Sequence, residues 1–310
     1  MAKPFRFGVQ LPKEPSASRW RDTARKVEDL GYSTLFMPDH FGDELAPMPA
    51  IAMAAAHTTT LRIGSLVFDN DYKHPAILAK EAATIDFLSD GRLEFGLGAG
   101  WMKTDYDMLG LPYDSPAVRV DRFEEALHVI KRCFTGEQFT YKGEHYRITD
   151  YTSHPKPVQP GGPPLLIGGG GKRVLSIAAR EADIVGINPN LRAGAIGSDS
   201  VLDSMREQTD KKVAWVREAA GARIDDIEIQ MRFFITSVRP NRMELAEQLA
   251  PAFGVSPEEA LESAAACVGT VEEIIDQLER RREEWGVSYV VVGGDNIDEF
   301  APVVAKLAGT

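Results

Sequence analysis

The chain has 310 residues, of which 44% are hydrophobic, and its formal net charge at pH 7 is −11. Such an acidic chain is repelled by nucleic-acid phosphates and anionic lipid headgroups, which argues against a general nucleic-acid or membrane-surface role. No apolar run approaches the roughly 20 residues of a membrane-spanning helix, and the first residues contain no apolar signal core. We therefore predict a soluble protein of the cytoplasm.

Short apolar runs alternate with amphipathic helical segments along almost the whole chain. Eight runs have the length and composition of buried strands, and they are Phe5–Gln10, Thr34–Met37, Leu61–Val67, Leu93–Leu97, Leu165–Ile167, Asp183–Ile187, Ile227–Phe234 and Tyr289–Val292. Among the helices, Pro75–Leu88 begins with a proline, which suits a first helical turn. The series Ser256–Glu259 and Thr270–Glu273 have the pattern of capping boxes.

Eightfold alternation of strand and helix, with strands that are apolar on both faces, predicts a parallel sheet closed as a (β/α)8 TIM barrel. A doubly wound open sheet is the alternative. The barrel is expected to form a single domain over residues 1–310.

Two segments interrupt the alternation. Residues 136–146 are predicted to form a β-hairpin that turns at Lys142 and Gly143, and a proline-rich loop follows, so residues 136–164 form an insertion. Residues 188–204 are rich in Gly, Ser and Asp and are predicted to form a mobile lid.

The two cysteines, Cys133 and Cys267, lie far apart in segments that have helical character, outside any CxxC or Cys/His pattern. We expect buried free thiols in a reducing compartment. No pair of histidines has helical metal-binding spacing with a carboxylate, so no metal site is predicted.

A strand at Leu165–Ile167 runs into Gly168, Gly169, Gly170 and Gly171, followed by Lys172 and Arg173. Four glycines permit a close approach of the backbone, and the next helix offers free N–H groups to a phosphate. A Walker loop is excluded because its first glycine and final hydroxyl positions hold Leu and Arg. The dinucleotide fingerprint is excluded because its third glycine is missing. A flexible turn without a ligand is the alternative.

Several motifs occur in an order that resembles a known family. They are Phe36-Met37-Pro38-Asp39-His40-Phe41, the block His74–Trp101, Pro155–Pro160, Gly168–Lys172 and Ala178–Asp183. Together they resemble the bacterial luciferase-like monooxygenase superfamily, whose members are TIM barrels that bind a flavin or a deazaflavin. The Asp-His-Phe element is most similar to the branch that uses coenzyme F420, and FMN is the alternative cofactor.

The resemblance implies roles for particular residues. His40 is the expected catalytic residue, since an imidazole can carry the proton that accompanies hydride transfer near neutral pH. Asp39 is expected to contact the cofactor or to orient the local backbone. Leu66 and Val67 are expected to be joined by a cis peptide bond that bulges against the cofactor ring, with a trans bond as the alternative.

The remaining implied contacts lie in three loops. Ala99 and Gly100 are expected to touch the cofactor, and Gly168–Gly171 with Lys172 to bind its phosphate. Sugar-phosphate dehydrogenases of the F420 branch carry an acid where this chain has Trp101. The Trp101 side chain is expected to line an apolar substrate pocket or to pack in the core, while Asn188 lies in the lid over the substrate.

The resemblance thus implies an F420-dependent oxidoreductase that transfers a hydride between the deazaflavin and a small organic substrate, with His40 handling the proton. The alternatives are an FMN-dependent monooxygenase that receives reduced flavin from a partner reductase, and a flavin-binding protein without turnover. A homodimer is expected from the relatives.

Overall fold

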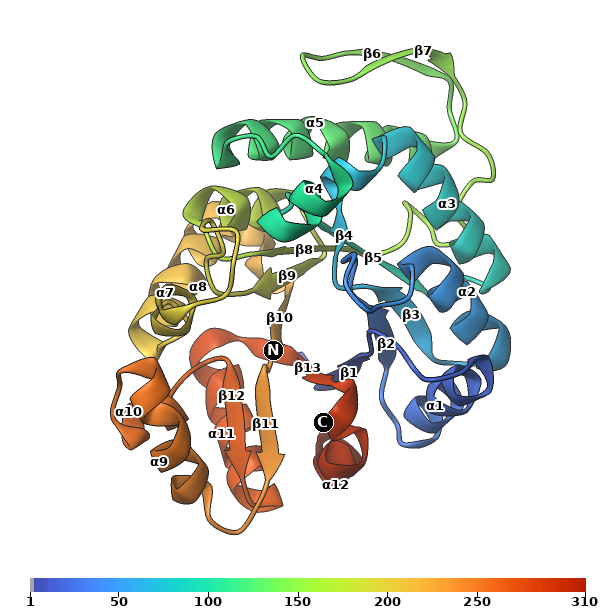
Figure 1. The fold of residues 1–310 in the computed structure, drawn as a ribbon. Helices are drawn as coiled ribbons and strands as arrows, with labels where there is room; N and C mark the ends of the chain where they lie inside the picture. The colour runs from blue at the N-terminus through green and yellow to red at the C-terminus, as the bar shows by residue number, and fades with distance from the viewer. Residues whose placement is uncertain (1–2) are drawn as a thin grey trace.

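The computed structural model describes residues 3–310, and its central feature is a ring of strands surrounded by helices (Figure 1). The strands of the ring are β1 (Arg6–Gln10), β2 (Thr34–Met37), β3 (Arg62–Ser65), β5 (Leu93–Gly98), β8 (Leu165–Gly169), β9 (Ile184–Ile187), β10 (Glu228–Arg232) and β13 (Val287–Gly293). They pair in parallel in the order β3-β2-β1-β13-β10-β9-β8-β5, and pairing of β3 with β5 closes the ring. The predicted TIM barrel is confirmed, and the open sheet is excluded.

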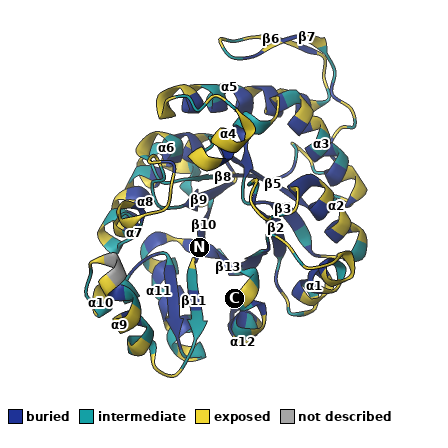
Figure 2. Ribbon diagram, viewed as in Figure 1, coloured by how far each residue is buried: buried dark blue, intermediate teal, exposed yellow. Residues whose placement is uncertain are grey.

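The outer layer buries the helix faces that meet the strands, while the outward faces remain exposed (Figure 2). Its helices are α1 (Ala17–Asp29), α2 (Pro47–His57), α3 (Pro75–Leu88), α5 (Pro116–Thr135), α6 (Lys172–Glu181), α8 (Arg206–Ala220), α11 (Val271–Trp285) and α12 (Ile297–Leu307). Their starts follow local chemistry: Ser115 caps α5 before a proline, and the capping box of Thr270 and Glu273 begins α11 as predicted. None of the described helices is long and apolar enough to cross a membrane.

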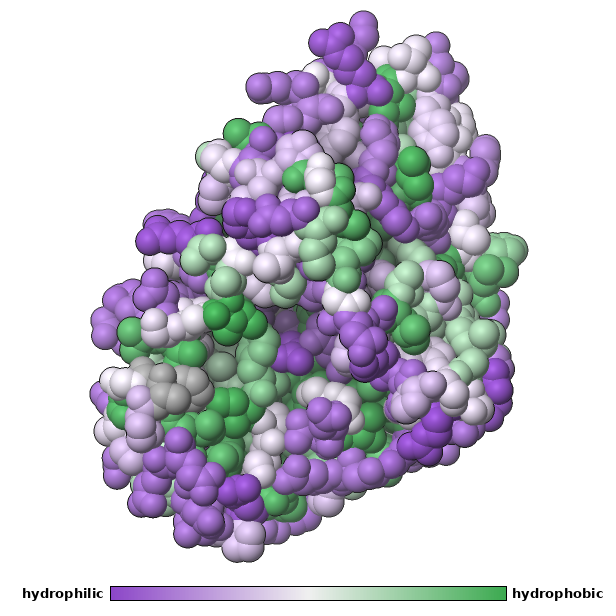
Figure 3. Space-filling model, viewed as in Figure 1, coloured by the Kyte–Doolittle hydropathy of each residue, from purple (hydrophilic) through white to green (hydrophobic). Residues whose placement is uncertain are grey.

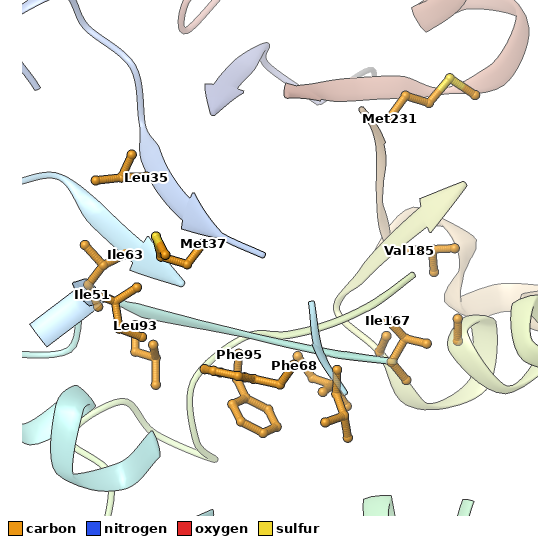
Figure 4. Close-up of a cluster of buried hydrophobic side chains, with 14 of the residues drawn as sticks. Leu35, Met37, Ile51, Ile63, Phe68, Leu93, Phe95, Ile167, Val185 and Met231 are labelled. Carbon is orange, nitrogen blue, oxygen red and sulfur yellow. The ribbon is translucent and has the colours of Figure 1, made fainter. Parts of the chain in front are cut away.

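Side chains alternate between two cores because successive strand residues point to opposite sides of the barrel wall. One set packs outward against the helices, and Figure 4 shows members of it on several strands together with Ile51 of α2. The other set fills the middle of the lumen and consists of Phe36, Leu166, Ile184, Tyr289 and Val291.

A charged cluster closes the lumen at the N-terminal ends of the strands. Glu94 is fully buried and accepts hydrogen bonds from Nη1 of Arg6 at 2.7 Å and from Nε of Arg62 at 2.8 Å. The hydroxyl of Tyr289 donates to the same carboxylate at 2.8 Å. With this end filled, a ligand can approach the lumen only from the C-terminal ends of the strands.

Two predicted strands end earlier than expected. The run from residue 61 to 67 stops at Ser65, and the chain resumes as β4 (Phe68–Asp69) beside β5. The peptide between Leu66 and Val67 is cis, as the resemblance implied. The run from residue 227 to 234 stops at Arg232.

A small sheet beside the barrel was not predicted. It pairs β11 (Ile235–Val238) with β12 (Ala266–Gly269) in parallel. Cys267 therefore lies on a strand and not in a helix, because a strand of four residues carries too little pattern to distinguish it from a helical segment. Cys133 lies in α5 as expected, and both thiols are buried and free.

The first predicted insertion contains the expected hairpin, which projects from the barrel (Figure 1) and consists of β6 (Phe139–Lys142) and β7 (Arg147–Tyr151). The turn covers residues 143–146, later than the predicted turn at Lys142 and Gly143, so the second strand of the hairpin lies beyond the predicted end at residue 146. Its turn is held by Glu125 of α5, whose carboxylate accepts hydrogen bonds from the backbone N–H groups of residues 144–146. The proline-rich loop that follows contains a cis bond before Pro155.

The second predicted insertion, residues 188–204, ends with the short helix α7 (Ser198–Leu202). Lys212 of α8 is 2% exposed and donates to the carbonyl of Asn188 at 3.0 Å and to that of Asp203 at 2.7 Å. The two ends of this segment, which we call the lid segment, are thus tied to one buried ammonium group. Further along the chain, α9 (Arg242–Phe253) and α10 (Pro257–Leu261) pack beside it.

Candidate active site

The C-terminal ends of the barrel strands form a hollow at the centre of the face seen in Figure 3. Continuing the inward alternation along each strand, Gln10, Gly98, Gly168 and Arg232 face this end of the lumen. Catalytic groups of TIM barrels gather at this end of the barrel. We call this region the barrel mouth.

His40 follows β2 at the mouth and is held by a buried carboxylate. Its Nδ1 lies 2.7 Å from Oδ2 of Asp105, which is 1% exposed at the start of α4 (Lys103–Leu109). The hydroxyl of Tyr72 donates to the same oxygen at 3.1 Å. A carboxylate accepts hydrogen bonds, so the contact places a proton on Nδ1 and leaves Nε2 as the exchangeable site. No described residue forms a hydrogen bond with Nε2.

Asp105 was not identified from the sequence. An acidic residue in the first turn of a helix is common, because it interacts favourably with the helix dipole, and therefore carries no specific signal of a site. Only the fold reveals that this first turn reaches the loop after β2.

Trp101 lies beside His40 and not in the core. The two rings meet edge to face, with centroids 5.5 Å apart and an interplanar angle of 87°. The backbone carbonyl of Trp101 accepts a hydrogen bond from Tyr113 at 2.9 Å. The indole therefore forms part of the wall around the imidazole.

Asp39 points toward the backbone of β4. Its Oδ2 accepts a hydrogen bond from the N–H of Asp69 at 3.1 Å, so it orients the local chain, one of its two expected roles. Burial raises the pKa of the Asp39 carboxyl to about 6 and that of Asp69 to about 7. This corner of the mouth thus contains two carboxyl groups that hold their protons to a higher pH than usual, and Asp69 remains partly protonated near neutral pH.

The carboxyl group of Asp69 and the hydroxyl group of Tyr106 leave room only for a glycine at position 100. Its φ angle is +75°, and a Cβ atom there would lie 2.0 Å from the Tyr106 hydroxyl and 2.8 Å from both Asp69 oxygens. Ala99 packs partly buried against the core. The glycine therefore serves the packing of the loop, whether or not the loop also touches a cofactor.

Val67 occupies space left by glycines on neighbouring strands. A Cβ added to Gly98 would lie 2.7 Å from a Val67 methyl group, one added to Gly96 would lie 3.1 Å away, and one added to Gly168 would lie 3.7 Å away. The carbonyl of Leu66 accepts a hydrogen bond from Gln10 at 2.7 Å. The Leu66–Val67 bulge is therefore fixed against the inner wall at the mouth.

The glycine loop after β8 has two different parts. A Cβ at Gly169 would lie 2.6 Å from Val174, and one at Gly170 would lie 2.4 Å from the Pro189 carbonyl, so internal packing accounts for both glycines. Gly171 is the N-cap of α6, where an added Cβ would meet only the Asn190 amide at 3.7 Å, and no side chain caps that helix. The N–H groups of the first turn of α6 are the part of this loop that can donate hydrogen bonds to an anion.

The two cations after the glycines have different surroundings. Arg173 donates to Asp121 at 2.5 Å and to Glu124 at 3.3 Å, both on α5, which turns it away from the mouth. Lys172 is exposed and lies 3.5 Å from Glu218. Lys172 is thus the more available of the two.

The lid segment begins with Asn188 at the mouth and extends to the loop that carries Trp101. The Asn188 amide nitrogen lies 3.1 Å from the position of a Cβ on Gly168, which places it at the mouth. Further along, the carbonyl of Gly194 accepts a hydrogen bond from the N–H of Lys103 at 3.1 Å. The lid segment therefore reaches from β9 to the loop that carries Trp101.

Among residues 3–310, no group of three or more His, Cys, Asp or Glu side chains is arranged to hold a metal ion.

The closed barrel, with an imidazole–carboxylate pair at the C-terminal ends of its strands, defines a TIM-barrel protein with an enzyme-like site. The chain belongs to the luciferase-like monooxygenase family, whose model matches residues 1–289. The family resemblance of the sequence motifs is therefore confirmed.

Relatives of two kinds are similar to this chain. F420-dependent glucose-6-phosphate dehydrogenase of Nakamurella multipartita is 28% identical over 242 residues, which cover 75% of this chain and 68% of the relative. Limonene 1,2-monooxygenase of Rhodococcus erythropolis is 29% identical over 282 residues, 84% of this chain and 70% of the relative. The coenzyme F420-dependent tetrahydromethanopterin reductase of Methanopyrus kandleri has a similar fold, with a TM-score of 0.77 and 20% identity over 97% of this chain and 99% of the reductase.

The raised pKa of Asp69 leads to a prediction about pH and stability. In the folded protein Asp69 keeps its proton up to about pH 7, whereas an unfolded carboxyl loses it near pH 3.8, so the free energy of unfolding falls as the pH rises between these values. Asp69→Asn removes this penalty. We expect the variant's gain in the free energy of unfolding to be about 3 kcal/mol larger at pH 8 than at pH 5.

Urea unfolding at the two pH values measures this gain. Asp43→Asn, which removes a carboxylate that is 89% exposed, is the control and should show no such difference. If Asp69→Asn changed the free energy of unfolding equally at both pH values, the raised pKa of Asp69 would be contradicted.

Proposed function

We propose that this chain is an oxidoreductase that uses coenzyme F420, or alternatively FMN, to transfer a hydride to or from a small organic substrate. The observation that carries the proposal is the His40–Asp105 pair with its exchangeable Nε2 at the barrel mouth. The relatives, which are dehydrogenases and monooxygenases by name, support the reaction class.

The mouth fits a flat ring with an anionic tail. The Leu66–Val67 bulge would lie against one face of such a ring, and Gly98 and Gly168 add no side chains of their own at the strand ends. The free N–H groups at the start of α6, with Lys172 nearby, suit the phosphate. A bound deazaflavin supplies a carbon that carries the hydride, and the chain supplies the proton and the geometry.

His40 performs the proton step in this proposal. Nε2 gives a proton to the substrate atom that becomes basic when the substrate is reduced, or takes it in the opposite direction. Asp105 stabilises the imidazolium and holds the ring in one orientation, and the indole of Trp101 packs against the imidazole. The lid segment and Trp101 exclude water from the substrate.

One prediction from this function concerns the cofactor. Titration of the purified protein with F420 and with FMN, followed by fluorescence quenching, should give at least tenfold tighter binding of F420. Lys172→Gln should weaken F420 binding severalfold through the loss of one charge–phosphate contact. The neighbouring substitution Arg173→Gln is the matched control and should leave binding unchanged, since Arg173 is already paired with α5. Tight binding of FMN with none of F420 would overturn the F420 assignment.

Another prediction concerns the pair of His40 and Asp105. His40→Ala should abolish turnover while it changes cofactor affinity by less than tenfold, about 1.4 kcal/mol. Asp105→Asn should lower kcat with little change in KM and alter the pH profile of kcat, because the amide no longer stabilises the imidazolium. The assay is the absorbance change of the cofactor with the best substrate from a panel of alcohols, ketones and unsaturated acids.

Unchanged turnover in His40→Ala would refute the catalytic assignment. Failure of every substrate in the panel to oxidise or reduce the bound cofactor in the unmodified protein would favour the binding protein without turnover. Oxygen-dependent turnover that needs an added flavin reductase would favour the FMN-dependent monooxygenase.

We also propose that the protein is a cytoplasmic homodimer that pairs through α2 and α3. A broad apolar groove of about 650 Å³ runs between these helices, and Lys80 and Glu81 add one charge of each sign to its lining. Along α3, Ile77 is 56% exposed and Leu88 is 69% exposed. A patch of this kind that carries both charges can pair with its own copy across a twofold axis.

The dimer makes a separate prediction. The double variant Ile77→Asp, Leu88→Asp should convert a particle of dimer mass to one of monomer mass in size-exclusion chromatography with light scattering, because it buries four carboxylates in the interface. Met108→Asp, at a residue of α4 that is 62% exposed, is the control and should keep the dimer. A monomeric unmodified protein would refute the proposal.

A further inference from the structure

Arg232 stands at the end of β10, on the inward side of the barrel wall. Glu228, four positions further back on the same face, pairs with Arg6 in the lumen, and Gln230 lies between Glu228 and Arg232, fully buried. In the closed ring, β10 is four strands from β3 in either direction. Arg232 therefore faces the mouth from the side opposite the Leu66–Val67 bulge and the carboxyl groups of Asp39 and Asp69.

The guanidinium of Arg232 has no acidic partner. No described residue forms a hydrogen bond or ion pair with it, and its Nε is buried. Burial lowers its pKa to about 10, with no carboxylate nearby to oppose the effect. By contrast, the other inward arginines, Arg6 and Arg62, share the carboxylate of Glu94.

What Arg232 does contact is an aromatic ring. Its guanidinium carbon lies 4.4 Å from the centroid of Phe234. A cation–π contact of this kind contributes about 0.5 to 2 kcal/mol, less than the cost of keeping an unpaired cation from water. The arrangement therefore leaves the remaining N–H groups of the guanidinium available to an anion.

The same phenylalanine lines an apolar cavity of about 220 Å³ beside the mouth. Its walls come from the lid segment, β11, β12, α9 and α10, and include Leu191, Ile235, Leu249 and Leu261. In Figure 3, hydrophobic side chains extend from the central hollow toward these elements. Phe234 thus links the two features, because its ring contacts the guanidinium of Arg232 and also lines the cavity.

We propose that Arg232 and this cavity form the substrate-recognition site for an organic acid that has an apolar chain. The acid group binds the guanidinium at the mouth, and the chain lies in the cavity under the lid segment. The inference rests on the proposed oxidoreductase function for the identity of the ligand as substrate, and it goes further by naming the substrate's chemical class.

The cavity volume sets the length of the chain. A methylene group occupies about the volume of a water molecule in the liquid, roughly 30 Å³, so the cavity holds about seven carbon atoms. Octanoate is therefore a fitting probe, octan-1-ol is its neutral counterpart, and acetate is the acid without the chain.

The test measures binding by calorimetry, with the full chain in the presence and absence of F420. Octanoate should bind at least tenfold more tightly than either octan-1-ol or acetate. Arg232→Gln should abolish the preference for octanoate over octan-1-ol while it leaves F420 affinity within threefold, and Arg232→Lys should restore part of the preference. Arg192→Gln removes an exposed charge from the lid segment and is the control, with no expected effect.

Three outcomes would overturn the proposal. The first is equal binding of octanoate and octan-1-ol to the unmodified protein. The second is an unchanged preference for octanoate in Arg232→Gln, with the fold verified by its thermal unfolding. The third is a loss of F420 binding in Arg232→Gln without a loss of octanoate binding, which would assign the guanidinium to the anionic tail of the cofactor. Because octanoate is also measured without cofactor, a failure of the F420 assignment leaves this result interpretable.

Discussion

The buried carboxylate of Glu94 determines which end of the barrel is open to a ligand. Two guanidinium groups and a phenol converge on it across strands β1, β3, β5 and β13. Removing one partner of such a cluster leaves an uncompensated buried charge, which costs about 3 to 5 kcal/mol, so the cluster is strongly constrained. It fills one end of the lumen with charge and hydrogen bonds, and the apolar layer above it closes the middle. Only the C-terminal ends remain for chemistry.

At those ends, residues far apart in the sequence meet because their strands are neighbours. His40 follows β2 and Asp105 follows β5, and β3 lies between these two strands in the ring. The loop from Trp101 to Lys103 also carries a contact with the lid segment at Gly194. One short helix, α4, thus connects His40, through Asp105, with the lid segment, through Lys103.

Much of this arrangement could be predicted from the sequence where the signal is local or repeated. The alternation of strands and helices predicted the barrel, and the capping box at Thr270 predicted the start of α11. The hairpin was also predicted, although its turn lies at residues 143–146 and not at Lys142 and Gly143. The motifs also identified His40 and the cis bond at Leu66–Val67 correctly as features of the mouth. These features depend on residues that are adjacent in the chain.

The features that were missed depend on tertiary neighbours. Asp105 resembles an ordinary residue of a first helical turn, and Arg232 resembles the last residue of any amphipathic strand. The strand that holds Cys267 is too short to show its period. The glycines were detected but given one reason, an approach to a ligand, whereas Gly100 and Gly170 are required by Tyr106 and Pro189. A glycine in the sequence indicates that space near its backbone is limited, but it does not indicate which neighbouring group limits that space.

The distribution of charge around the mouth gives the site a direction. Asp39, Asp69 and Asp105 lie on the side of β2, β4 and α4, and Arg232 lies across the ring on β10. A net charge of −11 repels anions from the protein surface as a whole. At the mouth, however, burial strengthens the field of a single cation, because little water screens it. An anionic ligand of the kind proposed above would therefore be attracted to the β10 side of the mouth, where Arg232 lies.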